Sequence, residues 1–172
     1  TVALAGTLTA LGLTLGISSV FFELAKFSGY SSEEAFVLPF LAESLDVRGL
    51  LLGGTIIAAL GALDDVTITQ TATVLELRAR NSDLSASQLA MSGLRIGREH
   101  IASTVNTLLL AYAGSSIPLL LLFAVSEQSL ADVANSELIA IELVRTLCGS
   151  IGLVAALPIT TYLAAFLVRT DQ

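Results

Sequence analysis

The chain of 172 residues is 54% hydrophobic and only 13% charged, with a mean hydropathy of +0.83, which excludes an ordinary soluble domain. Its formal net charge of −7 excludes the broad basic surface that nucleic-acid binding requires. The single cysteine, Cys148, lies in an apolar run and is interpreted as a small buried side chain. These properties predict an all-α, polytopic transmembrane helix bundle that forms one domain over residues 1–172.

Four segments are predicted to span the membrane, namely 1–22, 49–75, 101–126 and 146–168. A helix needs about 20 residues to cross the hydrocarbon. The charge-free part of the second segment, 49–63, is too short, so this helix must continue through Asp64 and Asp65. The chain does not begin with Met and its first segment has no basic start, so we expect an excerpt of a longer protein rather than a signal peptide.

The connections between the spans predict two further helices. Segment 28–49 contains an apolar patch around residues 36–41 and predicts a short outer amphipathic helix. Segment 81–100 predicts a cytoplasmic interfacial helix whose arginines lie near lipid phosphates. The positive-inside rule places segment 76–100 and both ends of the chain in the cytoplasm, because most basic residues lie there: Arg78, Arg80, Arg95, Arg98 and Arg169.

Small residues recur at intervals of four in the first two predicted spans. Such stripes allow transmembrane helices to approach one another closely. The pattern predicts close helix packing at three stripes, which are Gly12 with Gly16, Gly49 with Gly53, and Gly54 with Ala58 and Ala62.

Asp64 and Asp65 lie near the middle of the second predicted span. A charge at the bilayer centre costs about 2.5–3.5 kcal/mol on insertion scales, and such residues usually face a bundle interior or a water-filled path. Residues three or four apart share a side of a helix. Asp65 therefore shares its side with Gly54, Ala58 and Gly61, which predicts that Asp65 faces the bundle interior and Asp64 an adjacent groove.

Residue counts from the inner ends of the spans place Asn106 level with Gln70, and Asp65 level with Tyr112 and Ser115. Pro118 is predicted to kink the third span in the same layer. The candidate proton or ion site is therefore Asp64 and Asp65, and its polar neighbours are Gln70, Asn106, Thr107 and Ser115.

A carboxyl group in a low-dielectric site resists ionisation, and two adjacent carboxyl groups resist double ionisation. Such a pair can exchange a proton near physiological pH, which predicts proton-coupled movement. Two other interpretations are that the aspartates cap a short helix at the headgroups, or that they bind a partner helix in a non-transporting structural or regulatory subunit. An aspartyl protease is disfavoured because adjacent acids on one helix diverge. No sequence pattern indicates an enzyme, a cofactor or a metal site, and His100 has no second ligand near it.

The stretches "GALDDVTITQ" (61–70) and "GREHIASTVNTLLLAYAG" (97–114) resemble the YibE/F family of multi-spanning bacterial membrane proteins. This resemblance implies the bacterial plasma (inner) membrane, without implying an activity. The layout of 61–80 and of "HIASTVNT" (100–107) is more distantly similar to helices of SecD/SecF-type and RND-type proton-driven proteins. That similarity implies that Asp64 or Asp65 carries the proton. The expected partners are the lipid bilayer, protons, an unknown substrate, the missing N-terminal part and other membrane subunits.

Overall fold

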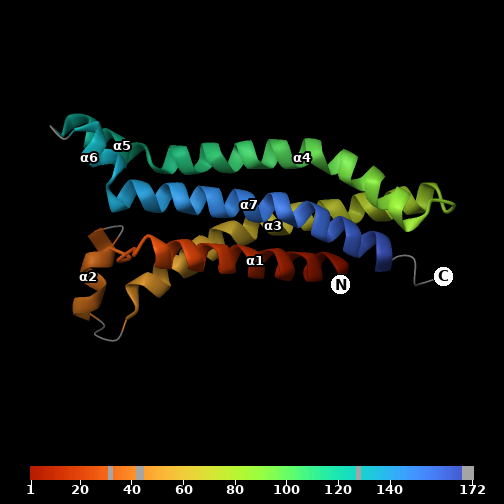
Figure 1. Cartoon of the computed structure of the whole chain (residues 1–172), viewed down its shortest axis with the longest axis horizontal. Helices are drawn as coiled ribbons and strands as arrows, with labels where there is room; N and C mark the ends of the chain where they lie inside the picture. The colour runs from red at the N-terminus through yellow and green to blue at the C-terminus, as the bar shows by residue number, and fades with distance from the viewer. Residues whose placement is uncertain (31–32, 42–44, 127–128, 168–172) are drawn as a thin grey trace.

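The computed structural model describes residues 1–30, 33–41, 45–126 and 129–167, and every regular element in these ranges is an α-helix. Figure 1 shows long helices running side by side, with the turn between α3 and α4 near the end of the bundle where α1 begins and α7 ends. The elements are α1 (Val2–Leu24), α2 (Glu33–Leu41), α3 (Val47–Arg80), α4 (Ala86–Ser115), α5 (Ile117–Val125), α6 (Leu130–Ala134) and α7 (Glu137–Leu167).

Helices α1, α3 and α7 pack against one another, and α4 packs on α3 and α7 (Figure 1). The central apolar contacts come from small and branched side chains, among them Ala10, Ala59, Leu63, Val66, Leu153 and Ala156. Lipid tails are as apolar as these side chains, so the hydrophobic effect alone does not hold such helices together. Close van der Waals packing and polar contacts between helices must contribute.

Three helices, α1, α3 and α7, are long and apolar enough to cross a membrane, and α4 with α5 makes a fourth if that bent pair is one span. The prediction of a multi-pass helical membrane protein is thus confirmed at this level. The helices α4 and α5 meet at an angle of 46°. Pro118 lies in the first turn of α5 and lacks the backbone N–H that would extend α4, so the predicted kink is also confirmed.

Helix α3 continues without interruption for 34 residues and carries Asp64 and Asp65 well inside it. The interpretation that these aspartates cap a helix ending at Leu63 is therefore wrong. Segment 66–75 has no Gly or Pro, and its threonines return their hydroxyls to backbone carbonyls one turn earlier, as at Thr71 and Thr73. Such bonds keep polar side chains compatible with a membrane helix.

The predicted separate interfacial helix over 81–100 is wrong, because these residues form a turn and then the first half of α4. Two local features produce this arrangement. Arg78 donates from Nη1 to the carbonyl oxygens of Ser82 and Leu84, at 3.0 and 2.7 Å. Ser85 and Gln88 then form a reciprocal capping box that starts α4 at once.

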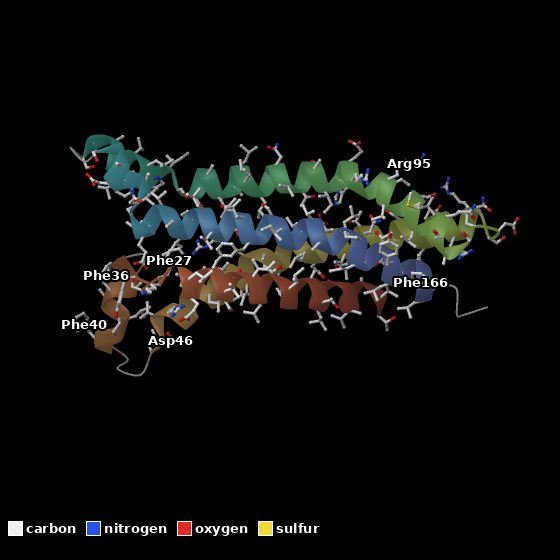
Figure 2. The ribbon with its side chains drawn as sticks, viewed as in Figure 1. Phe27, Phe36, Phe40, Asp46, Arg95 and Phe166 are labelled. Carbon is white, nitrogen blue, oxygen red and sulfur yellow. The ribbon has the colours of Figure 1, made fainter. Side chains whose placement is uncertain are left out.

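The opposite end of the bundle holds a short helix, α2, within segment 28–49 (Figure 2). The amphipathic character expected of this segment stays a prediction. Its Phe36, Val37 and Phe40 are exposed, and its position along a membrane surface stays a prediction. Glu137 ties this end together by accepting hydrogen bonds from the backbone N–H and the hydroxyl of Ser28, at 2.6 and 2.8 Å. Arg169, used above to orient the chain, lies outside the described residues.

Helix packing uses glycines other than the predicted ones. A Cβ at Gly12, Gly16, Gly53 or Gly54 would meet no atom of another helix, so these predicted glycines are not packing sites, whereas Ala62 of the third stripe packs against the central apolar cluster. Gly6 instead lies against Thr160, and Gly152 against Thr14, so α1 and α7 approach closely at two levels. Gly93 and Gly97 bring α4 against Gln70, and Gly97 also lies against Leu157 of α7.

We predict that Gly152→Ala destabilises the bundle by about 1–3 kcal/mol, as overpacking of a tight core does. The added methyl group would collide with the hydroxyl of Thr14 and lie 3.2 Å from its Cβ. Gly12→Ala is the matched control, because nothing lies near that position and alanine favours a helix. Unfolding of both variants in mixed detergent micelles, followed by circular dichroism, measures the difference. Equal stability of the two variants would contradict this account of the α1–α7 contact.

Candidate functional site

Asp64 and Asp65 point away from the bundle core, and the Asp65 side chain is 67% exposed. The residues that share its side, Gly54, Ala58 and Gly61, are exposed as well. The buried side of α3 consists instead of Thr55, Ala59, Leu63, Val66, Thr67 and Gln70. The prediction that Asp65 faces the bundle interior is therefore wrong. Leucine, valine and threonine fill the space between α1 and α7 better than glycines would.

Asp65 lies beside His100 of α4, with 3.8 Å between Asp65 Oδ2 and His100 Nε2. This distance is within ion-pair range but exceeds that of a direct hydrogen bond. The imidazole as a whole is 40% exposed, yet its Nε2 atom is buried and has no hydrogen-bond partner among the described residues. Histidine is the residue type that ordinarily changes charge between pH 5 and 8. The pair thus places an acidic and a basic side chain where a small approach or one water molecule would join them.

The level predicted for Asp65, beside Tyr112, is wrong because α4 begins at Ala86 and not at residue 101. Asp65 precedes the end of α3 by 15 residues (80 − 65), and His100 follows the start of α4 by 14 (100 − 86). A short turn brings such positions to one level. His100 therefore supplies the basic neighbour that sequence reasoning missed, and the capping residues Ser85 and Gln88 are the signal that could have located it.

Gln70 is the one buried residue among the four predicted polar neighbours. Its Nε2 donates to the backbone oxygen of Gly93 at 3.0 Å and to the hydroxyl of Thr161 at 2.7 Å. One turn earlier, the hydroxyls of Thr67 and Thr7 lie 2.5 Å apart. These contacts join α3 to α1, α4 and α7 in a buried polar layer next to the aspartates.

The other three predicted neighbours do not hydrogen-bond to Asp64, Asp65 or Gln70. Asn106, Thr107 and Ser115 have exposed side chains. The hydroxyls of Thr107 and Ser115 bond to carbonyls of their own helix, at 3.0 and 2.9 Å. At about 1.5 Å per residue along α4, Asn106 lies about 9 Å beyond His100, Thr107 about 10 Å and Ser115 about 22 Å.

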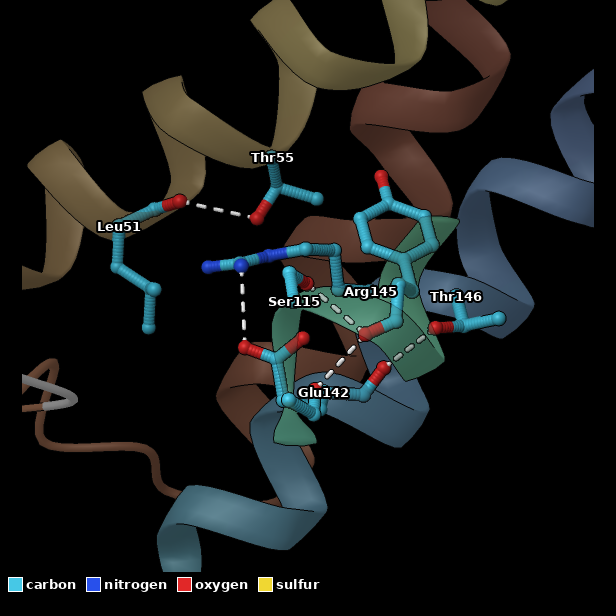
Figure 3. A network of polar contacts seen from close by, with 8 residues as sticks. Leu51, Thr55, Ser115, Glu142, Arg145 and Thr146 are labelled. Atoms are coloured by element: carbon cyan, nitrogen blue, oxygen red, sulfur yellow. Dashed lines mark hydrogen bonds and ion pairs between the residues drawn. The ribbon is translucent and has the colours of Figure 1, made fainter. Parts of the chain in front are cut away.

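A second polar cluster lies at the other end of the bundle and was not found from the sequence. Arg145 Nη1 donates to Glu142 Oε1 at 3.1 Å, and Figure 3 shows Arg145 pointing toward Leu51 and Thr55 of α3. Tyr112 borders a cavity together with Glu142. Glu142 Oε2, Arg145 Nε and the Tyr112 hydroxyl are buried with no hydrogen-bond partner in the described residues. The spacing of Glu142 and Arg145, three residues apart before an apolar run, is the sequence signal for this cluster.

The chemistry available in these two clusters is proton exchange and ion pairing. No group of three or more His, Cys, Asp or Glu side chains among the described residues is placed to hold a metal ion.

We predict that Gln70→Leu lowers the stability of the bundle by about 1–3 kcal/mol, because it leaves the Gly93 carbonyl and the Thr161 hydroxyl without their donor. Thr73→Val is the matched control, since its hydroxyl bonds only within α3. A double-mutant cycle with Thr161→Val, measured by unfolding in micelles, reports the coupling between the two side chains. Additive effects of Gln70→Leu and Thr161→Val would show that this bond does not join α3 to α7.

The comparisons with known proteins give one match. A family model described as YibE/F-like protein matches residues 1–170. No curated protein and no solved structure matches the chain. The match covers both the α3–α4 segment that holds the Asp65–His100 pair and the helices around it, and the chain belongs to the YibE/F-like protein family.

Proposed function

We propose that the chain is a proton-coupled transporter or transport-motor subunit of the bacterial plasma membrane, with Asp64 and Asp65 as its proton site. The single observation that carries this proposal is the contact of 3.8 Å between Asp65 and His100. Acids inside membrane helices usually mark proton or ion paths. The proposal involves no covalent chemistry, and the transported substrate is left open.

The pairing of an acid with an imidazole gives the site a way to change charge by one unit. When a proton arrives, Asp65 and His100 together become more positive by one charge, and when it leaves they become more negative. A charge beside an apolar helix surface is costly, so each protonation state favours a different environment for α3 and α4. Such a differential cost is what couples proton binding to a conformational equilibrium.

The buried layer beside the site provides a rigid reference for this change. Gln70 lies five residues from Asp65 and joins α3 to α4 and α7. Thr67 connects α3 to α1 through Thr7. A proton-driven displacement of the Asp65 region would therefore act on a junction of four helices. We place the α3–α4 turn and both ends of the chain in the cytoplasm, following the distribution of arginines.

The alternative function, a structural or regulatory subunit whose aspartates bind a partner helix, is favoured by a different observation. Gly54, Ala58 and Gly61 form an exposed stripe next to Asp65, and nothing lies near a Cβ built at Gly54 or Gly61. Small residues let a second transmembrane helix approach closely. A polar group on that helix would then hydrogen-bond to the carboxyl group of Asp65.

For the transport function we predict that Asp65→Asn and His100→Gln each abolish the dependence of activity on a pH gradient in reconstituted vesicles. Asparagine and glutamine retain hydrogen bonding but do not titrate near neutral pH. Asp64→Asn is expected to weaken the coupling, because Asp64 adds a second negative charge to the site. Asp83→Asn, in the exposed turn after α3, is the control that leaves coupling unchanged. Retention of full pH dependence in both Asp64→Asn and Asp65→Asn would refute the proton-site proposal.

For the alternative function we predict that Gly61→Leu dissociates the complex formed by this chain while its own fold persists. A leucine there would block the exposed stripe without touching the bundle, since no atom lies near that position. Gly12→Leu, at a similarly open glycine of α1, is the matched control. Native electrophoresis and light scattering in mild detergent measure the size of the complex. A complex of unchanged size in Gly61→Leu excludes the stripe as the docking surface.

A further inference from the structure

Two adjoining grooves on α4 share the residues Leu94 and Arg98. The first has a cavity volume of about 300 Å³ and is lined by Met91, Ser92, Leu94, Arg95 and Arg98. The second, of about 490 Å³, lies between α4 and α7. Beyond Leu94 and Arg98 its lining is apolar, made by Ile101, Ala102, Val105, Val154, Leu157 and Pro158. A basic recess thus leads directly into an apolar one.

The two arginines of the basic recess carry charge that the protein does not neutralise. Arg95 and Arg98 are exposed and make no ion pair or hydrogen bond with any residue that the structure describes. Figure 2 shows Arg95 on the outer side of α4. The arginines elsewhere in the described residues all have partners, namely Arg48, Arg78, Arg80 and Arg145. Glu99 follows Arg95 by one helical turn and shares its side of α4, but it forms no ion pair with Arg95 and does not line either groove.

We propose that these grooves form a binding site for one anionic phospholipid, with its phosphate at Arg95 and Arg98 and one acyl chain between α4 and α7. A guanidinium group matches the oxygens of a phosphate in geometry and charge. The apolar groove extends from Arg98 to Val105, about 10 Å along α4 at about 1.5 Å per residue, which accommodates part of an acyl chain. Basic pockets between transmembrane helices are known to suit lipid headgroups.

The arrangement favours a lipid over a free phosphate because the apolar groove opens from the same arginine. A phosphate ion would occupy the recess at Ser92, Arg95 and Arg98 and leave the α4–α7 groove without an occupant. A lipid fills both. His100 follows Arg98 by only two residues, but its side chain lies beside Asp65 of α3 and does not line either groove.

Tryptophan fluorescence tests this site, because the 172 residues contain no tryptophan. Ala102→Trp places a reporter in the apolar groove, and Leu8→Trp places one on the exposed side of α1 as a matched control. The chain is reconstituted in phosphatidylcholine vesicles in which a minor fraction of the lipid is brominated phosphatidylglycerol or brominated phosphatidylcholine. We expect brominated phosphatidylglycerol to quench the Ala102→Trp reporter more strongly than brominated phosphatidylcholine does, and to show no such preference at Leu8→Trp.

The arginine variants identify the headgroup contact. Arg95→Gln and Arg98→Gln should each weaken the preference for phosphatidylglycerol about fivefold, the effect expected for one basic residue near a membrane surface. Arg80→Gln is the matched control, since Arg80 already pairs with Glu76 at 2.6 Å. Native mass spectrometry of the tryptophan-free chain, with added phosphatidylglycerol or phosphatidylcholine, gives a second measurement that does not depend on the reporter.

Three results would overturn the proposal. The first is equal quenching by the two brominated lipids at Ala102→Trp. The second is a preference that survives Arg95→Gln combined with Arg98→Gln. The third is displacement of the lipid by inorganic phosphate beyond the effect of chloride at equal ionic strength, because this would show a site for phosphate rather than for a lipid. Transport activity is not used in any of these measurements, so they are independent of the proton-site proposal.

Discussion

The amide group of Gln70 fixes the relative positions of three helices, because it donates from α3 to a backbone oxygen of α4 and to a hydroxyl of α7. Inside a membrane a buried amide must find such partners within the protein. Helix α4 comes close enough to Gln70 for these bonds only because Gly93 and Gly97 have no side chains. The contact therefore sets the register between α3 and α4. With that register, the residue five positions before Gln70 lies beside His100, and the acid–imidazole pair follows from the packing.

The polar groups of the bundle form two clusters along its length, and the apolar core packs level with the first of them, since Val66 and Ile101 of that core adjoin Asp65 and His100 in sequence. Asp65 and His100 lie near the middle of α3 and α4, whereas Glu142 and Arg145 lie within the first third of α7, which follows α6. Arg145 points toward the segment of α3 that contains Thr55 (Figure 3). Thr55 and Asp65 are ten residues apart, or about 15 Å along the helix.

Much of this fold was predictable from composition and local chemistry, and the failures have specific causes. A span of about 20 residues is possible only if α3 continues through Asp64, and it does. Pro118 lacks a backbone N–H, which predicts the bend that is present between α4 and α5. The charged residues before residue 101 predict that the third span begins there. The helix begins earlier, at Ala86, because Ser85 and Gln88 cap it. That error moved Asp65 to the level of Tyr112. The small residues of α3 predict the wrong inward side, because the side chains buried in the bundle are mostly branched or carry a hydroxyl group.

The outward position of Asp65 places a condition on any function of this chain. An acid on the outer side of a membrane helix must be neutral, hydrated or covered. His100 meets part of this condition, because a carboxylate beside an imidazolium has no net charge, and the same is true of a carboxylic acid beside a neutral imidazole. The adjacent Asp64 is exposed as well and adds a further negative charge at this surface when it is ionised. This side of α3 therefore favours contact with water, a headgroup or another subunit. The two proposed functions would each meet this condition, because proton binding neutralises the acids and a partner helix covers them.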